Sequence, residues 1–182
     1  DLFQALHGEF RFTLDAAASH VNHKLPRYCT QEGYFAPNDH GHPSMVLMGD
    51  GLLMPWAGER VFCNPPFSVI SPWLEKAWRD APEVACILLP ANRMEQGLWQ
   101  TYVEPYRDRP GSPLSTRFLA GRRHFTVDGG KPILNKDTGK RSAPEFGVVL
   151  CIWDRRVPGG ITRPSVHASA VQSSESASKL QP

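Results

Sequence analysis

The sequence predicts one α/β domain built on an open, mostly parallel sheet with an antiparallel strand at its edge. Three observations lead to this fold class. Strand-like and helix-like segments alternate through the first two thirds of the chain. The run VACILLP at 84–90 is continuously apolar, as in a parallel strand buried on both faces. The last strand-like segments follow one another without a helix, and 182 residues suffice for one domain with a full core.

The first half of the chain contains two predicted strands. The alternating segment FRFTLD (10–15) predicts a strand that ends at Asp15. The polar stretch 16–29 predicts partial helix at most, and 34–51 predicts a loop with an apolar patch at 45–48. The segment RVFCN (60–64) predicts the second strand.

A helix is predicted after this strand, with Ser71 as its N-cap and Pro72 at its first position. Trp73, Leu74 and Ala77 follow at helical spacing. Beyond the strand at 84–90, the pattern predicts a short helix and three final strands, namely GLWQTYVEPY (97–106), TRFLAG (116–121), RRHFTV (122–127) and FGVVLCIW (146–153).

Composition is that of a globular protein, with 41% hydrophobic and 21% charged residues. No apolar run reaches the length of a membrane span, and no signal peptide opens the chain. The first residue is Asp1, not Met, so we expect a truncated N-terminus. Residues 157–182 are rich in Ser, Pro and Gln, which predicts a disordered tail after a domain at 1–156. Cys63, Cys86 and Cys151 lie in strand-like runs and are predicted to be buried, reduced thiols.

Charge is distributed unevenly along the chain. Residues 107–163 contain twelve Lys and Arg against five Asp and Glu, whereas residues 1–106 contain seven against twelve. A basic second half suits a polyanionic partner such as a nucleic acid. On charge alone, a solvated basic surface remains an equal alternative.

The segment VFCNPPFSVI (61–70) is the strongest candidate for a functional site. Two consecutive prolines end the strand, because neither can donate to a sheet ladder and each restricts the residue before it. Asn64 therefore stands on a stiff backbone at the carboxyl end of a strand, where open α/β sheets bind their ligands. A loop turn with Phe67 in the core is the alternative without function.

The polar groups of residues 64–67 are mostly acceptors, namely the Asn64 amide oxygen and backbone carbonyls without ladder partners. Acceptors suit a substrate NH2 group. An amine conjugated to an aromatic ring is a weak nucleophile, and two acceptors on its hydrogens return charge to the nitrogen in the transition state. The Phe67 ring could stack on a flat heterocycle and fix its orientation.

The ordered blocks FTLDAAAS, NHK, RYCT, DGL, VFCNPPFS, LLPA, RFLAGRRHF and APEFGVVLCIW resemble the phage-type, Dam-like DNA N6-adenine methyltransferases over most of residues 2–153. The resemblance implies a Rossmann-like class I sheet that binds S-adenosylmethionine (SAM), with DNA as partner and no obligate protein partner. It also implies base flipping, a bacterial cytoplasm and a phage or prophage origin. The four-residue motif alone is less specific, because related corners serve RNA and protein Gln methylation.

The resemblance also implies roles for individual residues. The catalytic residues would be Asn64, Pro65, Pro66 and Phe67. The cofactor would contact Asp15 at its methionine moiety and Asp50 near its adenine, together with Phe3, Ala16, Ala17 and Asn64. DNA would contact Ser68, Arg93, Arg122 and Arg123. No metal is expected.

Two departures qualify these assignments. Ala16–Ala18 stands where a dinucleotide site would have glycines, which argues against a dinucleotide but not against SAM, because SAM has no phosphate. The stretch 31–49 looks longer than usual, which affects the alignment of Asp50. No separate recognition domain is evident, so base specificity is expected from loops such as 104–115 or 128–145.

Several alternatives stay open. A zinc site would use His20, His23, Cys29, His40 and His42, whose spacing matches no standard finger, and solvated loop histidines are the simpler interpretation. Asp15 could instead be a helix N-cap, and Asp50 could belong to an ordinary Gly-Asp-Gly turn. Arg93 and Trp99 could line the site, or they could be surface or packing residues. The chain could methylate an amine of RNA or a protein Gln side chain, or it could be a degenerate methyltransferase fold that only binds DNA.

Overall fold

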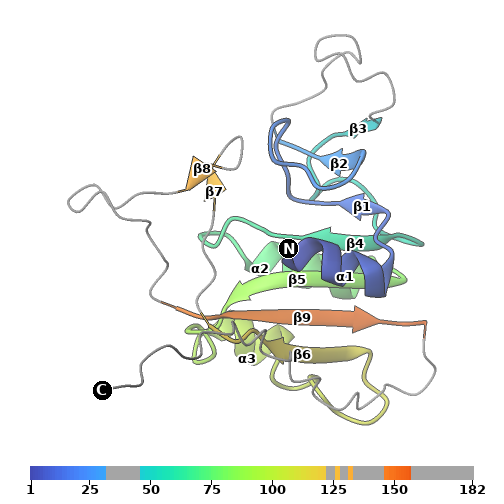
Figure 1. Ribbon diagram of the computed structural model, residues 1–182. Coiled ribbons are helices and arrows are strands. Elements are labelled where there is room, and N and C mark those ends of the chain that lie inside the picture. The colour runs from blue at the N-terminus through green and yellow to red at the C-terminus, as the bar shows by residue number, and fades with distance from the viewer. Residues whose placement is uncertain (32–45, 122–125, 128–130, 133–145, 157–182) are drawn as a thin grey trace, which may run out of the picture.

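The computed structural model describes residues 1–31, 46–121, 126–127, 131–132 and 146–156 of the chain. These residues form a mixed α/β fold (Figure 1). The helices are α1 (Leu2–Phe10), α2 (Ser71–Arg79) and α3 (Gly97–Tyr102). The strands of the main sheet are β1 (Leu14–Asp15), β2 (Arg27–Cys29), β3 (Val46–Met48), β4 (Arg60–Cys63), β5 (Val84–Pro90), β6 (Leu114–Phe118) and β9 (Val148–Asp154).

The seven strands follow the order β3-β2-β1-β4-β5-β9-β6. The first five are parallel, and β9 runs antiparallel to both of its neighbours. The reversed strand therefore lies one position inside the edge, whereas the sequence predicted it at the edge. The reason is burial: the first six residues of β9 are all buried, which an edge position would not provide.

Alternate residues of the central strands face two separate cores. On β5, Ala85, Ile87 and Leu89 pack in one cluster with α2 and α3, and Val84, Cys86 and Leu88 pack in the other with α1. Figure 1 shows α1 on one face of the sheet and α2 and α3 on the other. Both faces are covered by helices, as an apolar parallel strand requires.

The predicted strands are confirmed at β4, β5 and β9, and the strand predicted at 116–121 is confirmed only in part, because β6 begins at Leu114 and ends at Phe118. The expected first strand is largely wrong, because Phe10 ends α1 and only Leu14–Asp15 form a strand. Helix α1 is specified by an Asp1 cap, whose side chain accepts from the Phe3 N–H, and by the buried Phe3, Leu6 and Phe10.

Three further elements differ from expectation. Strands β2 and β3 lie in stretches that were expected to be partly helical or loop. The N-cap of α2 is Ile70, and Ser71 is its first helical residue. Of the segment predicted as a strand at 122–127, only Thr126–Val127 are among the described residues; they form β7, which pairs with β8 (Lys131–Pro132) in a separate two-stranded sheet.

Asp108 covers part of the outer side of the edge strand β6. The Asp108 N–H donates to the Leu114 carbonyl at 2.9 Å, and the Asp108 carboxylate accepts from the Thr116 N–H at 2.8 Å and from its hydroxyl at 2.6 Å. Asp108 adopts a left-handed conformation, with φ of 57°. It thus satisfies backbone groups of β6 that face away from β9.

All four cysteines are free and buried, as predicted for Cys63, Cys86 and Cys151. Burial raises the pKa of the Cys86 thiol to about 12, so this thiol is protonated at neutral pH. Within the described ranges, no helix is long and apolar enough to cross a membrane.

Candidate functional site

A pocket of about 550 Å³ opens at the carboxyl ends of the parallel strands. It lies where the strand order reverses, between β1 and β4, which is the position at which open α/β sheets bind ligands. Its size is typical of a small-molecule site. The lining residues are Ala16–Ser19, Asn22, Cys29–Gln31, Asp50–Gly51, Asn64–Phe67, Trp73 and Phe146.

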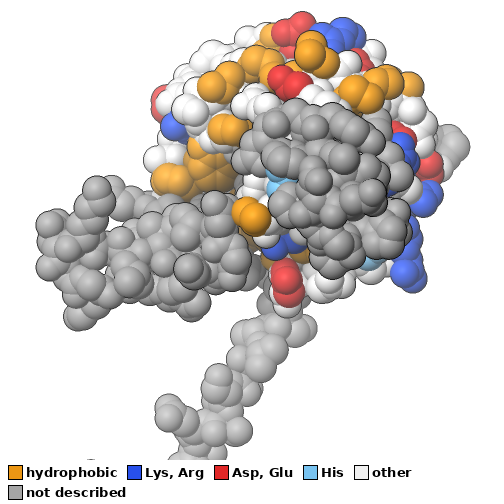
Figure 2. All heavy atoms as spheres, turned by 90° about the horizontal axis from the view of Figure 1, so that it is seen from above, with side chains coloured by type: hydrophobic (Ala, Val, Ile, Leu, Met, Phe, Trp, Pro, Cys, Tyr) orange, Lys and Arg blue, Asp and Glu red, His pale blue; other side chains and the backbone are white. Residues whose placement is uncertain are grey.

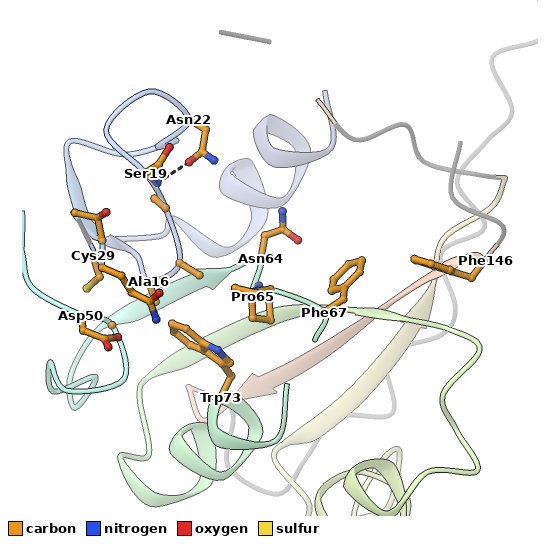
Figure 3. Close-up of a pocket in the computed structure, with 16 residues that line it drawn as sticks. Ala16, Ser19, Asn22, Cys29, Asp50, Asn64, Pro65, Phe67, Trp73 and Phe146 are labelled. Atoms are coloured by element: carbon orange, nitrogen blue, oxygen red, sulfur yellow. Dashed lines mark hydrogen bonds between the residues drawn. The ribbon is translucent and has the colours of Figure 1, made fainter. Parts of the chain in front are cut away.

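The corner, defined here as residues 64–67, follows β4 directly (Figure 3). Asn64 is exposed into the pocket, and no hydrogen bond joins its amide to another described residue. The Pro66 carbonyl accepts from the Val69 N–H at 3.0 Å, and the Phe67 carbonyl accepts from Arg93 Nη1 at 2.7 Å. Within the described part of the chain, the Asn64 side chain and the Pro65 carbonyl thus remain open acceptors.

The aromatic end of the pocket is formed by Phe67 and Phe146. Their ring centroids lie 5.8 Å apart at an interplanar angle of 64°, an edge-to-face contact. Figure 3 shows these two rings at one end of the pocket, Asp50 and Cys29 at the other, and Trp73 between them. The pocket therefore has an aromatic end beside the corner and a more polar end beside Asp50.

Asp15 ends β1 immediately before the lining residues. Its side chain is 2% exposed. Oδ2 accepts from the Lys24 N–H at 2.9 Å, and Oδ1 has no hydrogen-bond partner among the described residues. Burial raises the pKa of the Asp15 carboxyl to about 6, against the hydrogen bond from Lys24, which lowers it. A buried carboxylate oxygen without a partner is costly, and a ligand that donates to it would remove that cost.

Asp50 reaches the pocket on a loop that is held from two sides. A Cβ on Gly51 would lie 2.0 Å from the Ala16 carbonyl oxygen, so only glycine fits at this position. The Gly51 carbonyl accepts from Trp56 Nε1 at 3.1 Å. Asp50 Oδ1 accepts from the Leu52 N–H, which fixes the carboxylate within its own turn.

Helix α2 anchors the other end of this loop. The Trp56 N–H donates to Asp80 Oδ2 at 3.1 Å, and the same oxygen accepts from the buried Lys76 ammonium. Burial alone would raise the pKa of Asp80, but the hydrogen bonds from Lys76, the Trp56 N–H and Arg79 together outweigh it and lower the pKa. Lys76 also lies 5.4 Å from the centroid of the Trp56 ring.

The structure brings most predicted residues together at this pocket. Asn64, Pro65, Pro66, Phe67, Ala16, Ala17 and Asp50 all line it. Phe3 and Asp15 do not: the Phe3 ring packs edge-to-face on Phe62 at 5.1 Å, in the core cluster under α1, and Asp15 is buried directly before the lining residue Ala16. Ser68 is exposed directly after the corner, and Arg93 is bonded to the corner's backbone. Trp99 is 1% exposed and packs in the core, so its packing alternative is correct.

Several lining residues were not predicted. Thr30 and Gln31 follow β2, a three-residue strand too short to show periodicity. Had β2 been identified as a parallel strand, its carboxyl end would have pointed to both residues. Trp73 lies in a predicted helix and Phe146 begins a predicted strand, and their place at the pocket depends on tertiary structure.

Two of the histidines considered as zinc ligands, His20 and His23, contact Tyr28. His20 Nδ1 lies 2.9 Å from the Tyr28 hydroxyl, and the His23 ring stacks on Tyr28 at 4.3 Å. The described residues contain no group of three or more His, Cys, Asp or Glu that could hold a metal ion. His40 and His42 lie outside the described residues.

The described arginines of the basic second half are mostly bonded within the fold. Arg107, Arg117 and Arg156 pair with Glu104, Glu9 and Asp154, and Arg155 donates to two backbone carbonyls. On the face seen from above, basic and acidic side chains are intermixed (Figure 2). Arg122 and Arg123 lie outside the described residues, so their predicted role remains a prediction.

One predicted specificity loop lies far from the pocket. Strand β6 runs parallel to β5, because both pair antiparallel with β9, and Leu114 and Ala85 both pair with Trp153. Residues 104–113, which precede β6, therefore lie at the amino ends of the strands, opposite the pocket. The other predicted loop, 128–145, includes only the hairpin strand residues 131–132 among those described.

The family model of the DNA N-6-adenine-methyltransferases (Dam) matches residues 1–104 of the chain. The matched segment contains the corner, Asp15 and Asp50. No curated protein sequence matches the chain significantly.

Proposed function

Because the chain belongs to the DNA N-6-adenine-methyltransferase (Dam) family, we propose that it transfers a methyl group from SAM to the exocyclic N6 amine of adenine in DNA. One observation carries this proposal: a single pocket contains the Asn64–Phe67 corner together with Ala16, Ala17 and Asp50. The corner that would bind the adenine thus lies in the same pocket as the residues that would bind SAM, as methyl transfer between the two molecules requires.

The sheet supports a Rossmann-like class I fold. Its first five strands follow the order 3-2-1-4-5 of doubly wound sheets, and the pocket lies at the reversal of that order. We assign the methyltransferase unit to residues 1–156, since β9 ends at Asp154 and pairs along the whole of β5.

The pocket residues fit SAM. Ser19 Oγ, at the pocket, and the buried Asp15 Oδ1, one residue before the lining residue Ala16, lack partners among the described residues, and SAM carries an ammonium and hydroxyls that could donate to them. Asp15 would hold the methionine moiety, and Asp50 would hold the adenosine end. Bound SAM would supply an electrophilic methyl group on a sulfonium. No phosphate needs to be accommodated, which agrees with Ala16–Ala18 in place of a glycine-rich loop.

The corner would bind the target amine. The Asn64 amide oxygen and the Pro65 carbonyl would accept the two N6 hydrogens, and these hydrogen bonds would strengthen as positive charge develops on nitrogen. The two prolines keep these acceptors from moving, so little reorganisation is needed in the transition state. Phe67, with Phe146 at its edge, would hold the plane of the base.

The target base would have to leave the duplex. The corner lies in a pocket at the end of the sheet, and an adenine inside a base stack cannot bring N6 against Asn64. We therefore propose base flipping, with Ser68 next to the pocket mouth. The Lys and Arg residues of 107–163 that lie outside the described residues would contact phosphates, among them Arg122 and Arg123.

The experiment is methyl transfer from tritiated SAM to DNA, RNA and a mixture of unfolded proteins, followed by digestion and chromatography of the labelled product. The proposal expects N6-methyladenine from DNA and no comparable label elsewhere. Label in RNA or on protein Gln would show that the substrate is RNA or protein and not DNA. SAM binding without transfer to any of the three would identify a degenerate binder.

A further inference from the structure

We infer that Arg93 is a positioning residue that holds the catalytic corner in place, not the DNA phosphate contact that the sequence predicts. This inference rests on the proposed function, since it concerns the geometry in which the corner acts. If Arg93 holds the corner, its loss lowers kcat. If Arg93 instead contacts a phosphate, its loss lowers the affinity for DNA.

The first support is the hydrogen bond itself. Arg93 Nη1 donates to the Phe67 carbonyl oxygen at 2.7 Å, across 26 residues of sequence. The Arg93 side chain is half-buried, so the guanidinium does not extend freely into solvent. A charged donor at this distance makes a stronger bond than a neutral one.

The second support is the small number of backbone donors in the corner itself. Pro65 and Pro66 have no N–H, so two of its four residues cannot anchor it through a backbone N–H. The bond from Val69 to the Pro66 carbonyl is local and does not link the corner to another element. Arg93 lies three residues after β5, the longest parallel strand of the main sheet, and so ties the corner to a rigid part of the core.

The third support is where the bond is placed. Arg93 occupies the Phe67 carbonyl and leaves the Asn64 amide and the Pro65 carbonyl as the open acceptors. It also fixes the backbone that carries the Phe67 ring, whose edge contact with Phe146 orients it in the pocket. Losing this tie would let both the acceptors and the ring shift, and a displacement of about 1 Å can lower a rate by about 100-fold.

The experiment compares wild type with Arg93→Gln, Arg93→Lys and a control, Arg109→Gln. Arg109 is an exposed arginine at the opposite end of the sheet, so its variant removes the same charge away from the pocket. For each protein, kcat at saturating DNA and SAM, the salt dependence of duplex binding, the Kd for SAM and Tm are measured.

We expect Arg93→Gln to lower kcat by about 10–100-fold, while the slope of log K against log salt stays at the wild-type value. Arg93→Lys should recover part of the loss, because the lysine ammonium keeps the charge and can donate hydrogen bonds but lacks the planar guanidinium fork. The control should keep wild-type kcat.

Three results would overturn the inference. One is wild-type kcat in Arg93→Gln. Another is unchanged kcat with a salt slope flattened by about one, which would make Arg93 a phosphate contact. The third is a fall in Tm that accounts for the lost activity in both Arg93 variants. Failure of the wild type to label DNA would instead contradict the proposed function.

Discussion

Gly51 lies so close to Ala16 that a Cβ atom on Gly51 would stand 2.0 Å from the Ala16 carbonyl oxygen and 3.1 Å from the Cys29 Cβ. This contact joins the loop that carries Asp50 to the ends of β1 and β2. A side chain at position 51 would have to push the loop away from both strands.

Gly51→Ala should therefore destabilise the protein by roughly 1–3 kcal/mol, because the clash is with backbone that cannot move aside. It should also weaken SAM binding. Gly8→Ala is the matched control: Gly8 lies within α1, and a Cβ added there would have no atom within 4 Å, so the same change should stabilise by about 0.5–1 kcal/mol. Denaturant unfolding and SAM titration test both variants. Equal free energies of unfolding for Gly51→Ala and Gly8→Ala would contradict the close contact between Gly51 and Ala16.

Asn64→Ala removes one of the two proposed acceptors while leaving the rest of the pocket in place. We expect kcat to fall by about 10²–10³, as for loss of one transition-state hydrogen bond. The Kd for SAM should change only a few-fold. Methylation within a few-fold of wild type would remove Asn64 from the catalytic role.

Asp15→Asn should increase stability at neutral pH and weaken SAM binding at the same time. Because the pKa of Asp15 is raised from 3.8 to about 6, the folded state favours the protonated carboxyl. Wild-type stability should thus fall as pH rises from about 4 to about 6, by at most about 3 kcal/mol from this group. An uncharged amide side chain at position 15 lacks that dependence.

The measurement is Tm between pH 4 and pH 8 for wild type, Asp15→Asn and the exposed-carboxylate control Glu75→Gln. The difference between Asp15→Asn and wild type should grow across pH 4–6 and then level off. A constant difference at all pH values would show that Asp15 does not titrate in this range. Added SAM should stabilise wild type more than Asp15→Asn.

Replacing Arg122 and Arg123 together with Gln should flatten the salt dependence of DNA binding. Each phosphate contact contributes about −0.9 to the slope of log K against log salt, so two contacts would change it by up to about two. Affinity for SAM should not change. A wild-type slope near zero would argue against DNA and favour a protein substrate.

Much of the fold could be predicted because its central strands carry a strong signal. Strands β5 and β9 are long and almost wholly buried, so their residues are nearly all apolar. Strands β1 and β2 have two and three residues and cannot display any periodicity, yet they bound the pocket. Helix α1 did carry a signal, in the spacing of Phe3, Leu6 and Phe10 after an Asp cap, and the adjacent alternation of FRFTLD obscured it.

The site could be predicted where a side chain with a useful functional group stands next to residues that restrict the backbone, such as proline. Asn64–Phe67 is of this kind and lines the pocket, as does Asp50, which was assigned through the family resemblance. Phe146 and Gln31 could not be assigned, because they reach the pocket only through the pairing of β9 and β2 with distant strands. The Arg93 bond to Phe67 spans 26 residues and left no pattern in the sequence.

The position of Asp108 bears on how copies of this chain can associate. A sheet edge with unpaired backbone is a template on which another chain can add a strand, and this is a common route to aggregation. At Leu114 and Thr116 part of that template is already used, because Asp108 donates to the Leu114 carbonyl and accepts from the Thr116 N–H and hydroxyl. An incoming strand would first have to displace Asp108, so this stretch of β6 is protected against continuous sheet growth between molecules.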